Sequence, residues 1–404
     1  MEMRMQEEFH DIVIIGGGIC GLATALGLHK KGIKSIVLER SETLRNTGAG
    51  IAIFLNGWHA LDHLGVADQL RANSLHIIEK HNKRINKDGT EVIPISKEGL
   101  RCVRRSDLIE ALANSLPVEF VRFGCQIVAI QNDPVTSFPI VHIADGSIIR
   151  AKILIGCDGS NSVVAKTLGL KPPSLIQTQI VQGLTTYPNG HGLSNHFLQL
   201  WGDRMFIIRL PADKKTVFWF VKRELNRKDQ ENKEDPGLIR DETIEVLKDF
   251  PTEVIEMVKQ CDLNTISFHR IRYHVPWHLA LSNISKGPMT ASGDAVHQMD
   301  PSMAQGGSAS LEDAVVLARC LSKEMTINLS ESKMSDQETY KKAEVALQNY
   351  ARERRWRILI LSTKSHLIAS LLHASWLKRF TFLTILSKFL GGRSSHTQYN
   401  CGHL

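Results

Sequence analysis

Three short stretches, each combining glycines with an apolar strand or helix pattern, organise the hydrophobic and polar positions of this chain. Val13–Ile15 predicts a buried strand, and the helix expected after it covers Leu22–Lys31. Ile153–Ile155 predicts another buried strand, and the glycine-bearing stretch Gly293–Ser308 precedes a predicted helix over Ala309–Ser322. We therefore expect the chain to leave its first sheet and return to it.

The turn after the first strand is almost free of side chains. Gly16 allows a tight turn, Gly18 lets the backbone approach a pyrophosphate, and Gly21 lets the helix pack closely on the strand. The free N–H groups at the start of the helix would face the anion. A glycine-rich loop without a ligand is the alternative, but the strand, the helix and a following acid stand at the spacing of a dinucleotide site.

That acid is Glu39, at the end of the second predicted strand, Ser35–Glu39. A carboxylate in this place accepts a hydrogen bond from a ribose 2′-OH and repels a 2′-phosphate. The site is therefore expected to prefer FAD or NAD over NADP.

Small residues follow where the polar loop after Arg40 closes on Gly48–Ala49–Gly50. They would let the backbone approach a flat ring system. A helix over Asn56–Leu64 is expected to end at Gly65, and residues 75–103 predict a peripheral hairpin.

Arg105 directly precedes another predicted helix, with Ser106 or Asp107 as its cap. An arginine in this position is commonly solvated, but its side chain can also reach a cofactor phosphate or ribose. After this helix the pattern predicts a meander with a hairpin turn at Asp145–Gly146. Its strands are expected at 118–123, 125–130, 140–144 and 147–150.

The second buried strand ends in Asp158–Gly159. Asp158 could simply form a turn, but a glycine-flanked acid at the end of a buried strand is typical of the mouth of a ligand site.

Residues 176–223 differ from the rest because they contain three aromatic-rich strands. They predict an antiparallel sheet with one face available to cover a pocket. A helix over 240–260 and a last strand over 265–274 complete this region, which we interpret as the substrate domain. Candidate pocket residues are Gln199, Arg209, Phe218 and Phe220.

Composition narrows the class of protein. Hydrophobic residues make up 43% and charged residues 23% of the 404 positions, as in ordinary globular proteins. The net charge is +7, but the sequence has no run of basic residues interleaved with aromatic residues, so no nucleic-acid partner is expected. Much of the excess lies in the C-terminal part, where a solvated face is expected. These residues are Arg352, Arg354, Arg355, Arg357, Lys364, Lys378, Arg379, Lys388 and Arg393.

Seven cysteines include no C-x-x-C pair and no grouping with histidine at metal-ligand spacing, so reduced thiols and no metal are expected. The first strand begins near residue 11, which leaves no room ahead of it for a signal peptide. No uncharged apolar run reaches the roughly 18 residues of a spanning helix. These features predict a cytoplasmic protein.

Together, these motifs resemble those of single-component flavoprotein monooxygenases of the aromatic-hydroxylase type, a family that includes salicylate hydroxylases and zeaxanthin epoxidases. The matching motifs are G-x-G-x-x-G at Gly16–Gly21, Asp-Gly at Asp158–Gly159 and Gly-Asp at Gly293–Asp294. The small zeaxanthin-epoxidase-like monooxygenases of plants are similar over nearly the whole chain. They share Gly48–Ile51, Asn189–Gly192, Leu311–Ala314, Glu353–Trp356 and Cys401–Leu404.

The resemblance implies FAD, with Glu39 at the adenosine ribose, Arg105 near the ribityl chain or pyrophosphate, and Asp294 at the ribityl chain. Asp158–Gly159 would serve the FAD pyrophosphate and a transient NAD(P)H. The full implied cofactor set is Gly16, Gly18, Gly21, Glu39, Ala49, Gly50, Arg105, Asp158, Gly159, Asp294, Gly306 and Gly307. The implied chemistry is reduction of the flavin, addition of O2 at its C4a carbon, and oxygen transfer from the hydroperoxide to an apolar or aromatic metabolite. No catalytic residue is obligatory, and a flavin-proximal loop contains Pro301, Ala304 and Gln305.

The expected fold is therefore α/β, with a Rossmann-like FAD-binding domain interleaved with an antiparallel-sheet substrate domain and followed by C-terminal helices. The FAD-binding domain would comprise 1–75, 101–175 and 285–325, the substrate domain 76–100 and 176–284, and the helical segment 326–404. A monomer that binds a small molecule is expected.

Two residues depart from the family pattern. Gln298 stands where the family usually has proline, and Ala304 stands where it has the first glycine of Gly-Gln-Gly. If that glycine takes a positive φ, alanine would cost about 1 kcal/mol or shift the loop. We favour the simpler expectation that Ala304 takes an ordinary negative φ.

Two alternatives stay open. The first is an FAD enzyme that transfers no oxygen and acts as an oxidase, dehydrogenase or isomerising catalyst, as Gln298 and Ala304 would allow. The second is a flavin-containing protein that binds a membrane surface or a partner through the basic, leucine-rich segment 352–390. Leucine stripes more often form a core, which favours a helix pair packed on its own domain.

Overall fold

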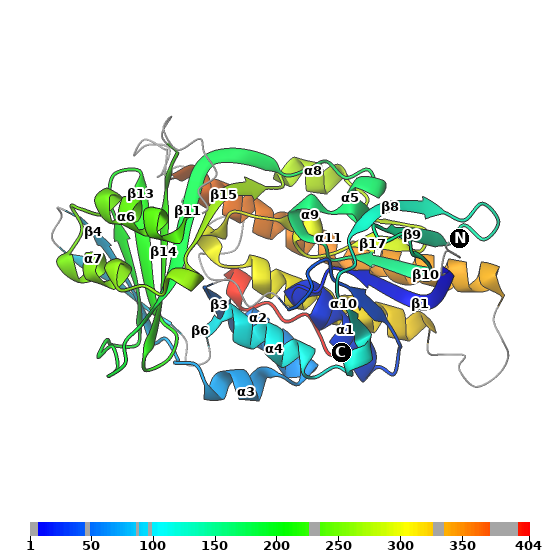
Figure 1. The fold of residues 1–404 in the computed structure, drawn as a ribbon, viewed down its shortest axis with the longest axis horizontal. Helices are drawn as coiled ribbons and strands as arrows, with labels where there is room; N and C mark the ends of the chain where they lie inside the picture. Colours follow the sequence, from blue (N-terminus) through cyan, green and yellow to red (C-terminus); the bar gives the residue numbers. More distant parts are fainter. Residues whose placement is uncertain are drawn as a thin grey trace.

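Two β-sheets lie towards opposite ends of the molecule, with long helices alongside the first (Figure 1). The structure is a computed structural model that describes residues 7–44, 49–85, 89–95, 99–225, 235–325, 335–371 and 395–404. Gly48 and residues 372–390 of the basic segment lie outside these ranges, as does Arg393. The α/β fold class is confirmed, whereas the exact domain boundaries stay a prediction.

The first sheet has a parallel centre. Strand β1 (Glu7–Ile15) pairs in parallel with β2 (Ile36–Leu38) and with β10 (Ile148–Gly156). Outside β10 lies β17 (Met289–Ala291), also parallel, and β7 (Val121–Arg122) adds to β2. Parallel strands covered on both faces are continuously apolar, which explains why Val13, Ile14 and Ile15 are all buried. Both expected returns of the chain are confirmed.

Two details of the predicted meander are wrong. Residues 148–150 and 153–155 belong to one strand, β10, which pairs with β1 along its whole length and with β9 (Pro139–Ile143) along its first part. Residues Val118–Phe120 form a 3₁₀ turn rather than a strand. The hairpin turn at Asp145–Gly146 is confirmed, with Gly146 at φ +90°. The remaining strands of this sheet are β8 (Ile127–Asn132) and β16 (Ser285–Lys286).

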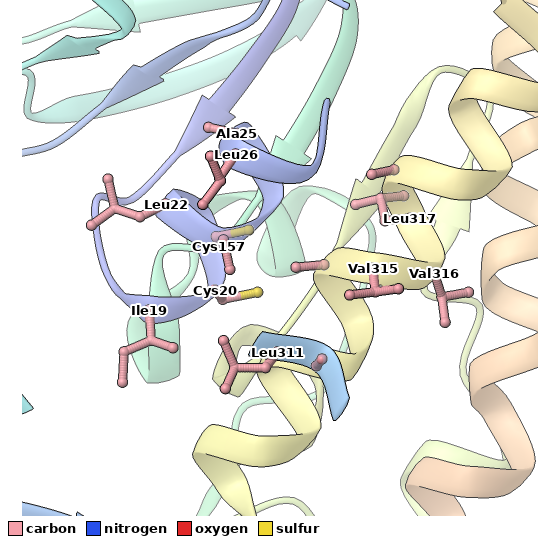
Figure 2. Packing of buried hydrophobic residues seen from close by; sticks show 14 of the residues in the cluster. Ile19, Cys20, Leu22, Ala25, Leu26, Cys157, Leu311, Val315, Val316 and Leu317 are labelled. Carbon is pink, nitrogen blue, oxygen red and sulfur yellow. The ribbon is translucent and has the colours of Figure 1, made fainter. Parts of the chain in front are cut away.

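Helix α1 (Ile19–Lys30) packs on α10 (Gly306–Met325), and α11 (Asp336–Leu371) packs on the other side of α10. Figure 2 shows side chains of α1 and α10 converging in one buried cluster. A Cβ added at Gly27 of α1 would lie 2.9 Å from the Cβ of Ala318, so glycine allows the close approach. Both α1 and α10 begin three residues earlier than expected.

The second sheet has the order β15-β11-β14-β13-β12-β4-β5 and is largely antiparallel. The three aromatic-rich strands are confirmed as β12 (His196–Trp201), β13 (Met205–Pro211) and β14 (Thr216–Glu224). The expected last strand is β15 (Ser267–Tyr273), and the hairpin consists of β4 (Glu79–Arg84) and β5 (Thr90–Pro94). Strand β11 (Ser174–Thr186) was not anticipated.

Helices cover the outer face of this sheet. The single helix expected over 240–260 is wrong, because the chain forms α6 (Pro236–Val246) and α7 (Thr252–Lys259) with Pro251 between them. Proline lacks a backbone N–H and disfavours helical geometry in the residue before it, so the helix breaks there.

A two-stranded ribbon, β3 (Gly50–Phe54) with β6 (Leu100–Arg104), lies between the sheets. It leads into α2 (Leu55–Leu64), which ends at Gly65 as expected, and into α4 (Arg105–Ala113). The predicted capping of α4 by Ser106 or Asp107 is wrong, because α4 begins at Arg105 and no side chain caps it. The short helices are α3 (Ala67–Ala72), α5 (Val163–Thr167), α8 (Pro276–Leu281) and α9 (Asp294–His297), and the 3₁₀ turns include η2 (Gly159–Asn161) and η4 (Pro301–Met303).

The basic residues of α11 do not all form a solvated face. Arg354 and Arg357 are buried and pair with Glu312, and Arg354 also pairs with Asp313, whereas Arg352 is exposed. The expectation of a solvated face is therefore wrong for these two arginines and for Lys364, which is also buried. Within the described part of the chain, no helix is long and apolar enough to cross a membrane.

Candidate functional site

A cavity of about 730 Å³ extends from the first sheet to the second. Its lining includes the glycine turn after β1, the ends of β2 and β10, strand β3, and the inner face of the second sheet. Twelve of the fifteen predicted site residues border it. They are Gly16, Gly18, Glu39, Gly50, Arg105, Asp158, Gly159, Asp294, Pro301, Ala304, Gly306 and Gly307.

The glycine turn has three different steric requirements. Gly16 stands at φ +103°, and a Cβ there would lie 2.4 Å from the Cys157 carbonyl oxygen. At Gly21 a Cβ would lie 1.9 Å from the Gly16 carbonyl oxygen, so this residue supports the turn from behind and does not border the cavity. A Cβ at Gly18 would meet no protein atom within 4 Å, and no side chain caps α1. The helix start and Gly18 thus present bare backbone to the cavity.

Glu39 is buried at the end of β2. Its carboxylate accepts hydrogen bonds from the N–H groups of Gly17, at 2.7 Å, and Ser41, at 2.9 Å. The side chain therefore stabilises the glycine turn while it borders the cavity. A carboxylate oxygen can accept more than one hydrogen bond, so these contacts leave capacity for a ligand hydroxyl.

Asp158 uses its carboxylate within the protein. It accepts from the Ser162 hydroxyl at 2.5 Å and from the Val163 N–H at 2.7 Å, at the start of α5. Burial raises its pKa, and these hydrogen bonds oppose the shift. The role of a turn former is thus supported for its side chain, and Gly159, at φ +75°, extends the backbone of the turn along the cavity.

Asp294, the first residue of α9, has the opposite arrangement. Its side chain is exposed towards the cavity, and none of the described residues forms a hydrogen bond or ion pair with its carboxylate. The adjacent Gly293 stands at φ +64°, and its N–H donates to Asp313 at 3.0 Å. This fixed turn leaves the Asp294 carboxylate available to a ligand.

The loop Met299–Gln305 borders the cavity with Pro301 and Ala304. Ala304 stands at φ +50°, ψ +38°, so the expectation of an ordinary negative φ is wrong. Gln305 is buried outside the cavity lining, and its side-chain oxygen accepts from the Asn56 amide at 3.0 Å. Ala49 is likewise buried outside the lining, and its carbonyl accepts from the Arg105 N–H at 3.0 Å.

The inner face of the second sheet is mostly apolar. Phe218 and Phe220 border the cavity, whereas Trp219 between them points to the helices on the outer face. Arg209 also lies on the outer side, 3.6 Å from Glu253 of α7, and Gln199 is buried without bordering the cavity. Two of the four pocket candidates are therefore wrong. The apolar side chains of the sheet that line the cavity are Ile180, Phe197, Ile208, Leu210, Phe218, Phe220 and Ile271.

Comparison with known proteins identifies the kind of ligand for this cavity. A family model described as "FAD binding domain" matches residues 10–346. The chain belongs to this FAD-binding family.

Its relatives include Monooxygenase 1 of Arabidopsis thaliana, 42% identical over 401 residues that cover 97% of this chain and 99% of that protein. 3-Hydroxybenzoate 6-hydroxylase 1 of Aquipseudomonas alcaligenes is 31% identical and covers 78% of this chain and 82% of the relative. The crystal structure of Klebsiella pneumoniae HpxO, complexed with FAD and uric acid, matches with a TM-score of 0.77 at 20% identity, covering 97% and 96% of the two chains. The expectation of an FAD-dependent monooxygenase is confirmed at the level of the family.

The cavity of this FAD-binding protein fits its cofactor on structural grounds. Bare backbone at Gly18, an uncapped helix start and an unpaired carboxylate at Asp294 are the features that a pyrophosphate and a polyol chain require. Among the described residues, no group of three or more potential metal ligands stands together. The individual cofactor contacts stay predictions.

Sequence reasoning missed the buried polar network behind this FAD site. Asp313 accepts from His297 at 2.6 Å and from Arg354 at 2.6 Å, and burial alone would raise its pKa, but these two cations lower it to about 2. The neighbouring Glu312 accepts from Asn56 at 2.7 Å. A signal was present in the sequence, because the motif Leu311–Ala314 contains the adjacent acids Glu312 and Asp313 and the motif Glu353–Trp356 contains Arg354. Nothing in the spacing of the two motifs indicated that these side chains form ion pairs.

Proposed function

We propose that the protein is an FAD-dependent, NAD(P)H-consuming monooxygenase that hydroxylates or epoxidises a small, largely apolar or aromatic molecule. One observation carries the proposal: a single cavity joins the dinucleotide-type turn to the apolar face of a second sheet, with the loop Met299–Gln305 between them. A cofactor and a substrate can therefore meet without leaving the protein interior.

Specific residues would hold FAD at the first sheet. Gly18 and the start of α1 would receive the pyrophosphate, and Glu39 would accept from the adenosine ribose. Arg105 would reach the ribityl chain or the pyrophosphate, and Asp294 would accept from ribityl hydroxyls. Bound FAD, once reduced by NAD(P)H, supplies the activation of O2, and the protein contributes orientation, dryness and hydrogen bonds.

The second sheet supports an apolar substrate. Its apolar lining side chains can exclude water and stack on a ring, while Gln182 adds an amide and β15 adds His269, Arg270 and Arg272. Lys222 lies on the same face of β14, but its ammonium group already pairs with Asp300 at 2.6 Å. The phenylalanines thus offer contact area rather than charge. This apolar area favours phenolics, indoles or terpenoids.

The test uses purified protein supplied with FAD. We expect flavin absorption bands, oxidation of NAD(P)H that increases with a true substrate, and transfer of one ¹⁸O atom from ¹⁸O₂ to the product. A panel of phenolics, indoles and terpenoids would identify the substrate class. Protein without a flavin spectrum after addition of FAD would contradict the proposal.

A second candidate, an FAD oxidase or dehydrogenase, is favoured by one observation. Ala304 holds a left-handed conformation in the loop beside the cavity, and it packs against the apolar cluster that contains Phe218 and Phe220. Oxidation of a substrate without ¹⁸O in any product would support this candidate over the first.

Location and assembly form part of the same proposal. All seven cysteines are free thiols, which supports a reducing compartment such as the cytoplasm. A monomer is proposed, with at most weak contact to a membrane surface.

A further inference from the structure

Lys222 and Asp300 form an ion pair that is almost completely removed from solvent. The Lys222 ammonium group donates to both carboxylate oxygens of Asp300, at 2.8 and 2.6 Å, and to the Ser302 hydroxyl at 2.8 Å. Both side chains are 1% exposed. The pair therefore lies in the protein interior, where a charge is stable only with such partners.

The ion pair connects the two halves of the cavity. Lys222 follows Phe218 and Phe220 on the inner face of β14, so it shares a strand with the apolar lining. Asp300 stands at the head of the turn Pro301–Met303, where its carboxylate also accepts from the Ser302 N–H at 2.9 Å. The pair thus joins β14 of the second sheet to the loop whose residues Pro301 and Ala304 border the cavity.

Helix α11 holds the same loop from behind. The Ser365 hydroxyl donates to the Asp300 carbonyl at 2.8 Å, and Met299 and Met303 pack with Leu361. The loop needs external support because Ala304 takes a left-handed conformation that alanine disfavours. Its position depends on contacts from β14 and α11 rather than on its own backbone preference.

Stability alone does not explain this arrangement. Burial lowers the pKa of Lys222, although Asp300 opposes that shift, so desolvation of the ammonium group is not fully offset. A pair of uncharged residues of similar size would often be equally stable. What an ion pair with three directed hydrogen bonds adds is a fixed position for the loop.

We propose that Lys222 is a positioning residue that locks the loop Asp300–Ala304 against FAD in the cavity. The proposal rests on the proposed function only in taking FAD as the occupant. Lys222 does not border the cavity and acts through Asp300. Because β14 also carries Phe218 and Phe220, the ion pair fixes the loop Asp300–Ala304 relative to these two side chains of the cavity lining.

The test separates positioning from stability with two variants. Lys222→Met leaves the Asp300 carboxylate buried without its cation, so the melting temperature should fall. The double variant Lys222→Met/Asp300→Asn removes both charges and keeps an acceptor for the Ser302 N–H, so the melting temperature should recover. In both variants we expect FAD to bind about tenfold more weakly, the scale of losing a residue that supports a site from behind.

The matched control is Arg209→Met, which removes a buried cation from the outer face of the adjacent strand. Its FAD dissociation constant and the fine structure of its flavin absorption bands should equal those of the wild type. A double variant with wild-type FAD affinity and spectrum would overturn the proposal, even if Lys222→Met does not fold. Wild-type protein that binds FAD but consumes no NAD(P)H would overturn the proposed function and leave these readouts usable.

Discussion

The glycine turn Gly16–Gly21 and the loop Met299–Gln305 border the same cavity but obtain their shapes in opposite ways. In the turn, the shape depends on positions without a side chain, because a Cβ at Gly16 or Gly21 would collide with the backbone. In the loop, side chains do the positioning, through Asp300, Met303 and Gln305.

The difference matters for function. A turn built from missing side chains fits an invariant group such as pyrophosphate, and it tolerates almost no substitution. A loop fixed by distant side chains can shift when any of those contacts changes. Chemistry at the flavin ring is therefore expected to vary with residues far from the ring, whereas cofactor binding depends on the turn itself.

The largest effect is expected for Gly21→Val, which tests the turn. Its Cβ would lie 1.9 Å from the Gly16 carbonyl oxygen. We expect the free energy of unfolding of the apoprotein to fall by about 3 kcal/mol or more. Thermal melting without FAD measures this. The control is Gly18→Val, whose Cβ meets no protein atom, so that variant should melt like the wild type yet fail to bind FAD. Equal melting of both variants would show that the turn is not sterically defined.

Asp294→Ala should weaken FAD binding by about 1.5–3 kcal/mol, because a charge-assisted hydrogen bond to the ribityl chain is lost. Apoprotein melting should not change, since the carboxylate is exposed and no described residue holds it. Fluorescence titration with FAD gives the affinity. The affinity of Asp294→Asn should lie between those of the wild type and Asp294→Ala. Wild-type affinity in the alanine variant would rule out the assigned contact.

Low pH should reduce the free energy of unfolding through His274, which lies next to the loop Met299–Gln305. The backbone N–H of His274 donates to the Gln298 carbonyl beside the loop. Burial of the imidazole, and secondarily the nearby His297 and His278, lower the pKa of His274 to about 4. Between that value and an unfolded pKa of about 6.5, unfolding takes up a proton. His274 should therefore reduce the free energy of unfolding by about 1.4 kcal/mol for each pH unit lost within this window.

His274→Gln should remove that one proton from the pH dependence. Denaturant unfolding at several pH values between 4 and 7 measures the slope. His396, whose pKa burial also lowers to about 4, stays in place and keeps part of the slope. An unchanged slope in the variant would mean that His274 already titrates normally in the folded protein.

Ala304→Gly should have the smallest effect and the most direct bearing on oxygen chemistry. Glycine relieves the left-handed strain, so the free energy of unfolding should rise by up to about 1 kcal/mol. If the methyl group disturbs the dry site, hydrogen peroxide formed per NAD(P)H oxidised should also fall.

Arg204→Gly is the control, because Arg204 also stands at a positive φ, +51°, but in the turn between β12 and β13. It should relieve strain without changing peroxide formation. An equal peroxide ratio in wild type and Ala304→Gly would remove Ala304 from the control of oxygen chemistry.

The two regions also explain what the sequence could predict. The requirements at Gly16, Gly18 and Gly21 are local, since strand, turn and helix follow one another along the chain. Phe218 and Phe220 were correct pocket candidates. Arg209 was not, because it alternates with Ile208 and Leu210 of β13, which line the cavity.

Contacts between distant segments could not be predicted. Nothing in the pattern pairs Lys222 with Asp300, or Asn56 with Gln305, and the φ of Ala304 depends on such contacts. The break at Pro251 is different, because proline is a visible signal that one continuous helix could not accommodate.

The order of strands in the first sheet has a consequence for synthesis of the protein. β1 pairs with β10, and β10 with β17, so the sheet is not complete until Ala291 has been made. Asp294 and the start of α10 follow even later along the chain. Such long-range parallel pairing is slow to form, and an incomplete sheet exposes unpaired edges. On the ribosome, the first strand must therefore wait for most of the polypeptide before a cofactor site exists, and a supply of FAD can assist only the final stage of folding.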